Sequence, residues 1–124
     1  MDLDERRILI NDLCSRLPYG IIVHIIRKNI TEQLFCIDAR SQEVWLNDAA
    51  SYVDIDEIKP YLRPMSSMTE EERKYYNSLS ILIADSECDV YEEMDWLNSH
   101  HFDYRGLIEK GIALEAPSDM YKIE

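Results

Sequence analysis

The stretch DWLNSHHFDYRGLIEKG, from Asp95 to Gly111, gathers two histidines, two aspartates, an arginine, a tyrosine and a tryptophan within seventeen residues. Such a mixture of imidazole, carboxylate and guanidinium groups could form a metal site, an acid–base catalytic site or a set of structural hydrogen bonds. Each possibility needs a different arrangement of these side chains, so their spacing distinguishes among the three.

The spacing of His100 and His101 disfavours a metal site. Adjacent residues on a helix point about 100° apart, so both imidazoles cannot reach one ion from regular helical geometry. The sequence has no HExxH motif, and His24 falls in a predicted strand. At a helix end, histidines can instead hydrogen-bond the last carbonyl groups and interact favourably with the negative end of the dipole. The sequence predicts no bound metal and no cofactor.

A hydrolase that uses His101 with Asp103, Cys88 or a serine stays an alternative, because a carboxylate can orient an imidazole that activates a nucleophile. The chain offers no nucleophile elbow and no glycine-rich loop, and its 3 glycines make backbone cradles for an oxyanion or a phosphate scarce. We therefore expect a non-enzymatic protein, with a small hydrolase or metal-dependent enzyme as the alternative. No small-molecule ligand is predicted.

The acidic run DSECDVYEEMD, residues 85–95, could bind calcium, because three acids occupy alternate positions from Asp85 onward. It does not fit an EF-hand loop, since Val90 stands at the position of the turn glycine and Trp96 at that of the bidentate glutamate. A solvated helix start, with Asp89 as its cap, is the better interpretation. The acids of this run could also attract a basic partner or mimic a phosphate backbone.

The net charge of −12 is the most unusual global property of the chain, and it is unevenly distributed. Residues 1–64 carry a net charge of −3, whereas residues 65–124 carry −9. Such a field repels phosphate backbones, which makes direct nucleic-acid binding unfavourable. We expect a protein partner, and the sign of the charge favours a basic one; an acidic mimic of nucleic acid is the second alternative.

Size and composition indicate a single globular domain over residues 1–124. Hydrophobic residues make up 46% and charged residues 31% of the chain, which excludes disordered and low-complexity classes. The 3 cysteines form no CxxC pair, so no disulfide framework is indicated and a cytoplasmic location is expected. No apolar run approaches the ~20 residues that span a bilayer, and the first residues lack a signal-peptide core, so no membrane association is expected.

The first half of the chain predicts one helix and four strands. Apolar spacing predicts a helix over residues 3–17, ended by Pro18-Tyr19-Gly20. GIIVHIIRKN is β-branched on both faces and predicts a central strand covered on both sides, which pairs with QLFCIDA in an antiparallel hairpin. Two shorter strands follow in EVWLND and SYVDI, residues 43–48 and 51–55.

The second half predicts helices. Pro60 and Pro64 are expected to exclude a central strand and to leave a helical turn and an ordered loop. A capping box at Thr69 opens a helix, and further helices are expected over residues 90–99 and in DYRGLIEKG, before IALEA as a short strand or a docked coil. The predicted fold class is α+β: an N-terminal helix, a small antiparallel sheet of about four strands, and two or three C-terminal helices.

Three strings of the sequence carry a resemblance: DLCSRLPYG, PYLRPMSSMTEEE and DWLNSHHFDYRGLIEKGIALEAP. With these strings, which cover a little over a third of the chain, the sequence resembles small uncharacterised proteins carried by phages and prophages of gut anaerobic bacteria. The resemblance implies a phage-related genetic context and an α+β fold. It implies no catalytic residue and no assigned activity.

The candidate interaction surface combines residues 60–68 with residues 100–105, because polar and aromatic loop residues on a rigid scaffold make good contacts. The alternative is that the same residues lock the proline-rich loop against the last helix, with Arg105 paired to Asp95 or Asp103. The residues of this candidate cluster are Tyr61, Arg63, Met65, His100, His101, Asp103, Tyr104 and Arg105.

Overall fold

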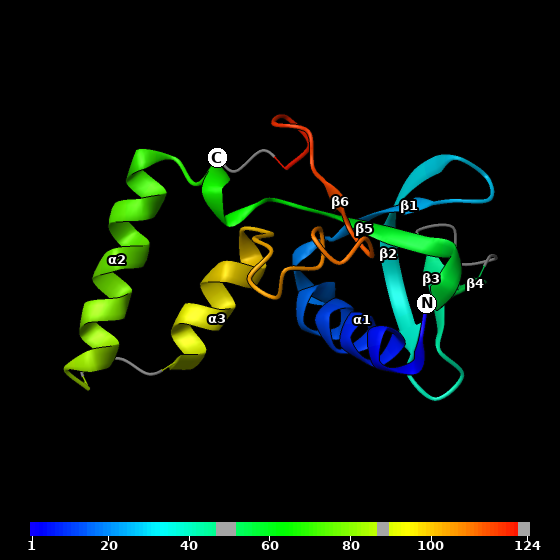
Figure 1. Ribbon diagram of the computed structural model, residues 1–124, viewed down its shortest axis with the longest axis horizontal. Helices are drawn as coiled ribbons and strands as arrows, with labels where there is room; N and C mark the ends of the chain where they lie inside the picture. Colours follow the sequence, from blue (N-terminus) through cyan, green and yellow to red (C-terminus); the bar gives the residue numbers. More distant parts are fainter. Residues whose placement is uncertain (47–51, 87–89, 122–124) are drawn as a thin grey trace.

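The computed structural model describes residues 1–46, 52–86 and 90–121. Figure 1 shows helix α1 beside a β-sheet, while helices α2 and α3 stand apart from the sheet as a pair. Within the described residues the sheet has six strands in the order β4-β3-β2-β1-β5-β6, and every neighbouring pair is antiparallel except β5 and β6. The elements are α1 (Leu3–Arg16), β1 (Ile22–Ile25), β2 (Ile30–Asp38), β3 (Glu43–Leu46), β4 (Tyr52–Asp54), β5 (Ile58–Leu62), α2 (Glu70–Ala84), α3 (Val90–Ser99) and β6 (Leu114–Glu115).

The predicted N-terminal helix is confirmed as α1. Asp2 and Glu5 form a capping box, in which the Asp2 carboxylate accepts a hydrogen bond from the Glu5 N–H at 2.8 Å. After the helix the chain turns at Gly20, whose φ of +73° lies in the left-handed region that favours glycine. Helix α1 buries Leu9 and Leu13 in the main hydrophobic core together with residues of the sheet.

The four predicted strands are confirmed as β1 to β4. Strands β1 and β2 form the predicted hairpin, with Ile25 opposite Ile30, and β1 lies inside the sheet between β2 and β5. The expectation that β1 is covered on both sides is wrong for one face. Val23 and Ile25 are buried, whereas Ile22 and His24 on the other face are only half-buried. The hydrophobic core therefore lies on the face of the sheet that α1 covers.

The sheet is larger than the predicted four-stranded antiparallel sheet, because β5 and β6 extend it beyond β1. IALEA does supply a short strand, β6, and this strand pairs in parallel with β5. Strand β5 occupies an inner position even though it contains Pro60, so the expectation that this proline excludes an inner strand is wrong.

The position of Pro60 in the ladder explains why it is tolerated. The Glu57 carbonyl accepts from Ile26 on the β1 side, and the Leu62 carbonyl accepts from Ala116 on the opposite side. Hydrogen-bonding groups alternate sides along a strand, so Pro60 directs its nitrogen away from β1. On that side the pairing with β6 begins only at the next residue, Tyr61. The missing N–H of Pro60 therefore costs no ladder hydrogen bond.

Two helices follow the sheet, as predicted. Thr69 and Glu72 form the predicted capping box of α2, with the Glu72 N–H donating to the Thr69 hydroxyl at 3.1 Å. The expected short helix in residues 103–111 is wrong, because Gly106 at φ +73° interrupts it and the chain makes only turns before Gly111 at φ +80°. No helix within the described residues is long and apolar enough to cross a membrane.

Candidate functional site

The candidate cluster comes together mainly where the end of α3 meets β5. The Arg63 N–H donates to the His101 carbonyl at 2.7 Å, and the Asp103 N–H donates to the Arg63 carbonyl at 2.8 Å. These bonds place Phe102 beside Arg63 as a parallel β-bridge. Tyr61 lies in β5 with its ring edge-on to His24, at 6.2 Å between ring centroids. The end of α3 is thus attached to the sheet by its backbone.

Met65 lies outside this junction, in the short turn that precedes α2. It belongs to the 3-10 turn Met65–Ser67, and its side chain is half-buried. The Arg73 guanidinium donates to the Met65 carbonyl at 3.4 Å, so the turn is held against the first turns of α2. Met65 is therefore part of the connection between β5 and α2.

His101 ends α3 in a conformation that usually requires glycine. Its φ is +65°, the Phe102 N–H donates to the Leu97 carbonyl and the His101 N–H donates to the Asn98 carbonyl, which together form a Schellman closure. The imidazole is only 6% exposed and stacks on the Tyr121 ring at 3.6 Å between centroids. His101 is therefore almost fully buried, with its ring against the Tyr121 ring of the C-terminal segment.

Tyr121 fastens that segment across two strands. Its hydroxyl donates to the Tyr61 carbonyl at 2.8 Å and accepts from the Ile22 N–H at 2.9 Å, where the ladder between β1 and β5 ends. Burial raises the pKa of Tyr121 above its ordinary value, so the hydroxyl stays protonated. The sequence gives no local signal for Tyr121, because its partners Ile22 and Tyr61 lie 99 and 60 positions earlier in the chain.

His100 and Asp103 both satisfy backbone groups. The His100 Nδ1 lies 3.0 Å from the Trp96 carbonyl, one of the last carbonyls of α3, which is the structural role expected for a histidine at a helix end. The Asp103 carboxylate accepts from the Leu107 N–H at 2.8 Å and from the Ile108 N–H at 3.0 Å. Asp103 therefore caps the turn that follows, and its oxygens are used by backbone donors.

Arg105 does fix the C-terminal region by an ion pair, but the prediction that its partner is Asp95 or Asp103 is wrong. Its Nε lies 3.3 Å from a carboxylate oxygen of Asp12 in α1. Asp12 also forms an ion pair with Arg16, in which the Arg16 Nε lies 2.8 Å from the Asp12 Oδ2. Both residues are fully buried. A single buried carboxylate thus joins α1 to the chain that follows α3.

Arg16 extends this contact to the end of α3. Its Nη2 donates to the Phe102 carbonyl at 2.7 Å, and its guanidinium lies 5.0 Å from the centre of the Tyr104 ring. The Tyr104 hydroxyl donates to Asn98 at 2.7 Å. The sequence carried a signal for Arg16, because it lies on the same helical stripe as Leu9 and Leu13.

Arg63 ties the start of α2 to the same junction. It makes a two-pronged pair with Glu72, at 2.9 and 2.7 Å, and its guanidinium lies 4.2 Å from the centre of the Phe102 ring. The hydrogen bond from Arg63 and the N–H of Thr69 hold the pKa of Glu72 down at about 2. Arg63 therefore connects α2, β5 and the end of α3.

Trp96 makes the aromatic contact between α2 and α3. Its ring centroid lies 5.3 Å from that of Tyr75, 6.0 Å from that of Tyr76 and 5.6 Å from that of Phe102. The Tyr76 hydroxyl also donates to Glu93 on α3 at 3.3 Å. The two helices are joined through this ring, and the ring joins both to the rest of the fold.

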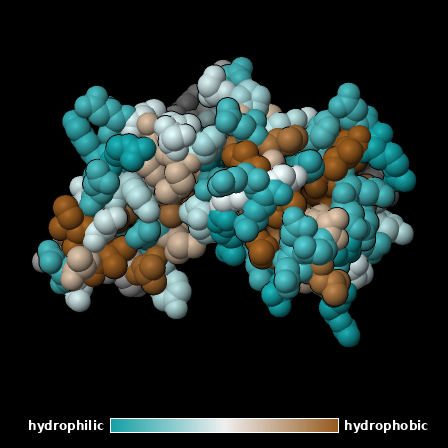
Figure 2. Space-filling model, viewed as in Figure 1, coloured by the Kyte–Doolittle hydropathy of each residue, from teal (hydrophilic) through white to brown (hydrophobic). Residues whose placement is uncertain are grey.

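The apolar stripe of α2 is incompletely covered. It consists of Tyr75, Tyr76, Leu79, Leu82 and Ile83, of which Leu79 is buried, Tyr75 is exposed and the other three are half-buried. Figure 2 shows apolar side chains gathered at the surface of the lower part of the α2–α3 pair. We call the α2 stripe, with Val90 and Met94 of α3, the hairpin face.

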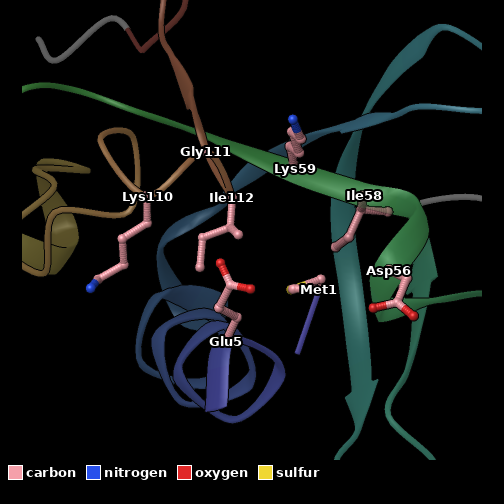
Figure 3. Close-up of a pocket in the computed structure, with 8 residues that line it drawn as sticks. All are labelled: Met1, Glu5, Asp56, Ile58, Lys59, Lys110, Gly111 and Ile112. Atoms are coloured by element: carbon pink, nitrogen blue, oxygen red, sulfur yellow. The ribbon is translucent and has the colours of Figure 1, made fainter. Parts of the chain in front are cut away.

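Two hollows occur near these elements. A groove of about 840 Å³ runs between the start of α2 and residues 115–118, and Arg63, Glu72 and His100 contribute to its polar walls. A smaller pocket of about 260 Å³ lies at the start of α1, where Figure 3 shows Glu5 together with Lys59 and Lys110. The groove adjoins the candidate cluster, whereas none of the cluster residues lines the smaller pocket.

No group of three or more His, Cys, Asp or Glu side chains in the part of the chain that the structure describes is placed to hold a metal ion. Cys88 and Asp89, the candidate nucleophile and the candidate helix cap, lie outside the described residues. Comparison of the chain with protein-family models, curated proteins and solved structures finds no match.

Stability is expected to fall as His101 becomes protonated. Burial, and then the positive charges of Arg16, His100 and Arg63, lower the pKa of His101 from 6.5 to about 4. The unfolded chain therefore takes up this proton at higher pH than the folded protein, and stability is lost as the pH falls from 6.5 toward 4. Between pH 7 and 5 the loss is about 2 kcal/mol, measurable by urea unfolding.

The control for this prediction is His101→Asn, because asparagine tolerates positive φ and does not titrate. His24 and His100 remain in the variant, so only the contribution of His101 is removed. The variant should lose much less stability over the same pH interval. An equal loss in both proteins would show that the buried imidazole is not the titrating group.

Proposed function

We propose that this chain is a non-enzymatic protein-binding or regulatory module of the cytoplasm, phage-associated as the sequence resemblance implies, and that it binds its partner through the hairpin face. The observation that carries the proposal is the incomplete burial of an amphipathic helix. A helix that packs on a core buries its apolar stripe, yet Tyr75 in the stripe of α2 is 47% exposed. An apolar face left open in this way is typical of a protein-interaction surface.

The candidate cluster supports this function by holding the hairpin face in a fixed position. Arg63 of the cluster anchors the α2–α3 pair through its ion pair with Glu72, and the neighbouring stacking of Trp96 on Phe102 adds to this attachment. A binding surface gains affinity when it is held in place before the partner arrives, because less conformational entropy is lost on association. The cluster therefore positions the interaction surface, and the hairpin face makes the contact.

The hydrolase alternative finds no support in the contacts of His101 and Asp103. The imidazole stacks under Tyr121, and the carboxylate accepts two backbone N–H groups, so neither side chain orients the other. The second alternative, an acidic mimic of nucleic acid, would use the acids of the same two helices. It requires that the protein compete with duplex DNA for a DNA-binding enzyme, which a displacement assay would detect.

Affinity capture from host-cell lysate with matched variants tests the proposed function. Tyr75→Ala removes an exposed ring from the hairpin face, while Ile81→Ala removes an apolar side chain, 62% exposed, from the opposite side of α2. We expect the wild type and Ile81→Ala to recover one stoichiometric partner, and Tyr75→Ala to recover it with affinity reduced about tenfold or more, since aromatic anchors dominate interfaces.

Circular dichroism and urea unfolding should show that both variants remain folded, so that a loss of binding can be assigned to the surface. Recovery of the partner in equal amount by both variants would contradict a contact through the hairpin face. If no stoichiometric partner is recovered by the wild type, the protein-binding function itself is wrong.

A further inference from the structure

We infer that the partner presents a basic amphipathic α-helix, which lies along the hairpin face as a third helix; this inference rests on the proposed function. The shape of the face is the first support. Helix α2 has 15 residues and α3 has 10, which corresponds to lengths of about 22 and 15 Å. A pair of helices of this length presents ridges and grooves that match one helix of similar length.

The spacing of the apolar side chains is the second support, with Tyr75 exposed, Leu82 half-buried and Leu79 buried between them. Tyr75, Leu79 and Leu82 follow one another at intervals of four and three residues, so they form a continuous line along α2. On α3, Val90 and Met94 are one turn apart. An occupant that contacts such lines repeatedly needs apolar residues at the same helical intervals, whereas an extended strand needs a free sheet edge, which two helices do not offer.

The acidic charge of α2 and α3 indicates what kind of partner helix would bind. The sequence from residue 70 to residue 99 carries nine acidic residues and two basic ones. Glu71 is exposed one turn before Tyr75 on the same side of α2, and Asp95 is exposed on α3. Acids around an apolar face favour a partner with lysine or arginine beside its apolar stripe, because complementary charge speeds association and excludes acidic competitors.

The same acids argue against two other occupants of the face. A second copy of this chain would bring another net charge of −12 and the same acidic helices against the first copy, and such like charges repel. A membrane surface rich in anionic lipids would be repelled for the same reason. Among these occupants of the hairpin face, the acidic charge around the face favours a basic helix from another protein.

Calorimetric titration with synthetic peptides tests the inference. The probe is a peptide of about 15 residues with leucines at helical intervals and lysines elsewhere. One control peptide has the same composition in scrambled order, and the other replaces every lysine by glutamate. We expect the periodic lysine peptide to bind about tenfold or more tightly than either control, because helical periodicity and charge are both required.

Variants of the protein show whether the peptide occupies the hairpin face. Tyr75→Ala and Glu71→Lys should each weaken binding about threefold or more, whereas Ile81→Ala and Glu70→Lys, on the other side of α2, should leave it unchanged. Glu70→Lys matches Glu71→Lys closely, because both change a charge in the first turn of the helix. Equal effects of the members of a pair would overturn the inference.

The remaining outcomes separate this inference from the proposed function. Equal binding of the scrambled peptide would mean that net charge alone is recognised, and concentration-dependent dimerisation lost in Tyr75→Ala would assign the face to a second copy; either result refutes the basic helix. Binding to anionic vesicles through Tyr75 would also refute it. Cross-linking could also place a captured partner on the hairpin face through an acidic or extended segment. That result would support the proposed protein-binding function and refute the inference of a basic helix.

Discussion

Replacing Asp12 by alanine is expected to lower the free energy of unfolding by about 3–5 kcal/mol. Asp12 is fully buried and pairs with Arg16, which is also fully buried, while Arg105 approaches from the second side. Without the carboxylate, the Arg16 guanidinium stays in the interior with one carbonyl as its partner, and burial of an uncompensated charge is costly. Urea unfolding near pH 7 would measure the loss.

The size of this loss matters because a domain of this kind has a total stability of only about 5–15 kcal/mol. The double variant Asp12→Leu with Arg16→Met is the control, since it removes both charges and keeps the volume apolar. It should be much closer to the wild type, because replacing a buried ion pair by apolar residues is often nearly neutral. A double variant as unstable as Asp12→Ala would show that the pair stabilises the fold directly.

Local patterns were enough to predict most elements of the fold, because helix periodicity, strand alternation and capping boxes are properties of neighbouring residues. The helix that begins after Thr69 and the hairpin of β1 and β2 are examples. The sequence does not predict strand β5, because Pro60 argues against an inner strand unless the register of the strand is known. Whether Pro60 loses a hydrogen bond depends on which neighbour its nitrogen faces, and only the assembled sheet determines that.

The candidate cluster could be predicted as a group but not in its connections. Arg105 was expected to meet a nearby carboxylate, whereas it meets Asp12, which lies in the first helix. With 25 acidic residues in the chain, composition cannot identify the one that the fold brings to a given arginine. The enclosure of His101 by Tyr121 was missed for the same reason, since long-range contacts leave no local pattern.

The hairpin face shows a different limit of the sequence. The spacing of Tyr76, Leu79 and Ile83 indicates an apolar stripe on α2. A stripe of this kind normally indicates a buried face. Tyr75 nevertheless remains exposed and three other members of the stripe are only half-buried. This follows from the placement of α2 beside α3 and away from the sheet, which Figure 1 shows and which no helical pattern could indicate.

Phe102→Ala is expected to destabilise the protein by about 3–5 kcal/mol, as is usual when a buried aromatic ring is truncated. The Phe102 side chain is 0% exposed and lies between the guanidinium of Arg63 and the ring of Trp96. Its removal leaves a cavity at the point where α2, α3 and β5 meet. Unfolding in urea, followed by circular dichroism, would measure the loss.

Phe102→Leu is the matched control, because it keeps most of the apolar volume and should cost less than about 1.5 kcal/mol. The alanine variant should also weaken the attachment of α2 and α3 to the sheet, so limited proteolysis should cut it first between β5 and α2 or after α3. Since the hairpin face depends on that attachment, Phe102→Ala should reduce partner binding even where most molecules remain folded. An alanine variant with the stability and protease resistance of the leucine variant would contradict the role of Phe102 as the contact that anchors the helical pair.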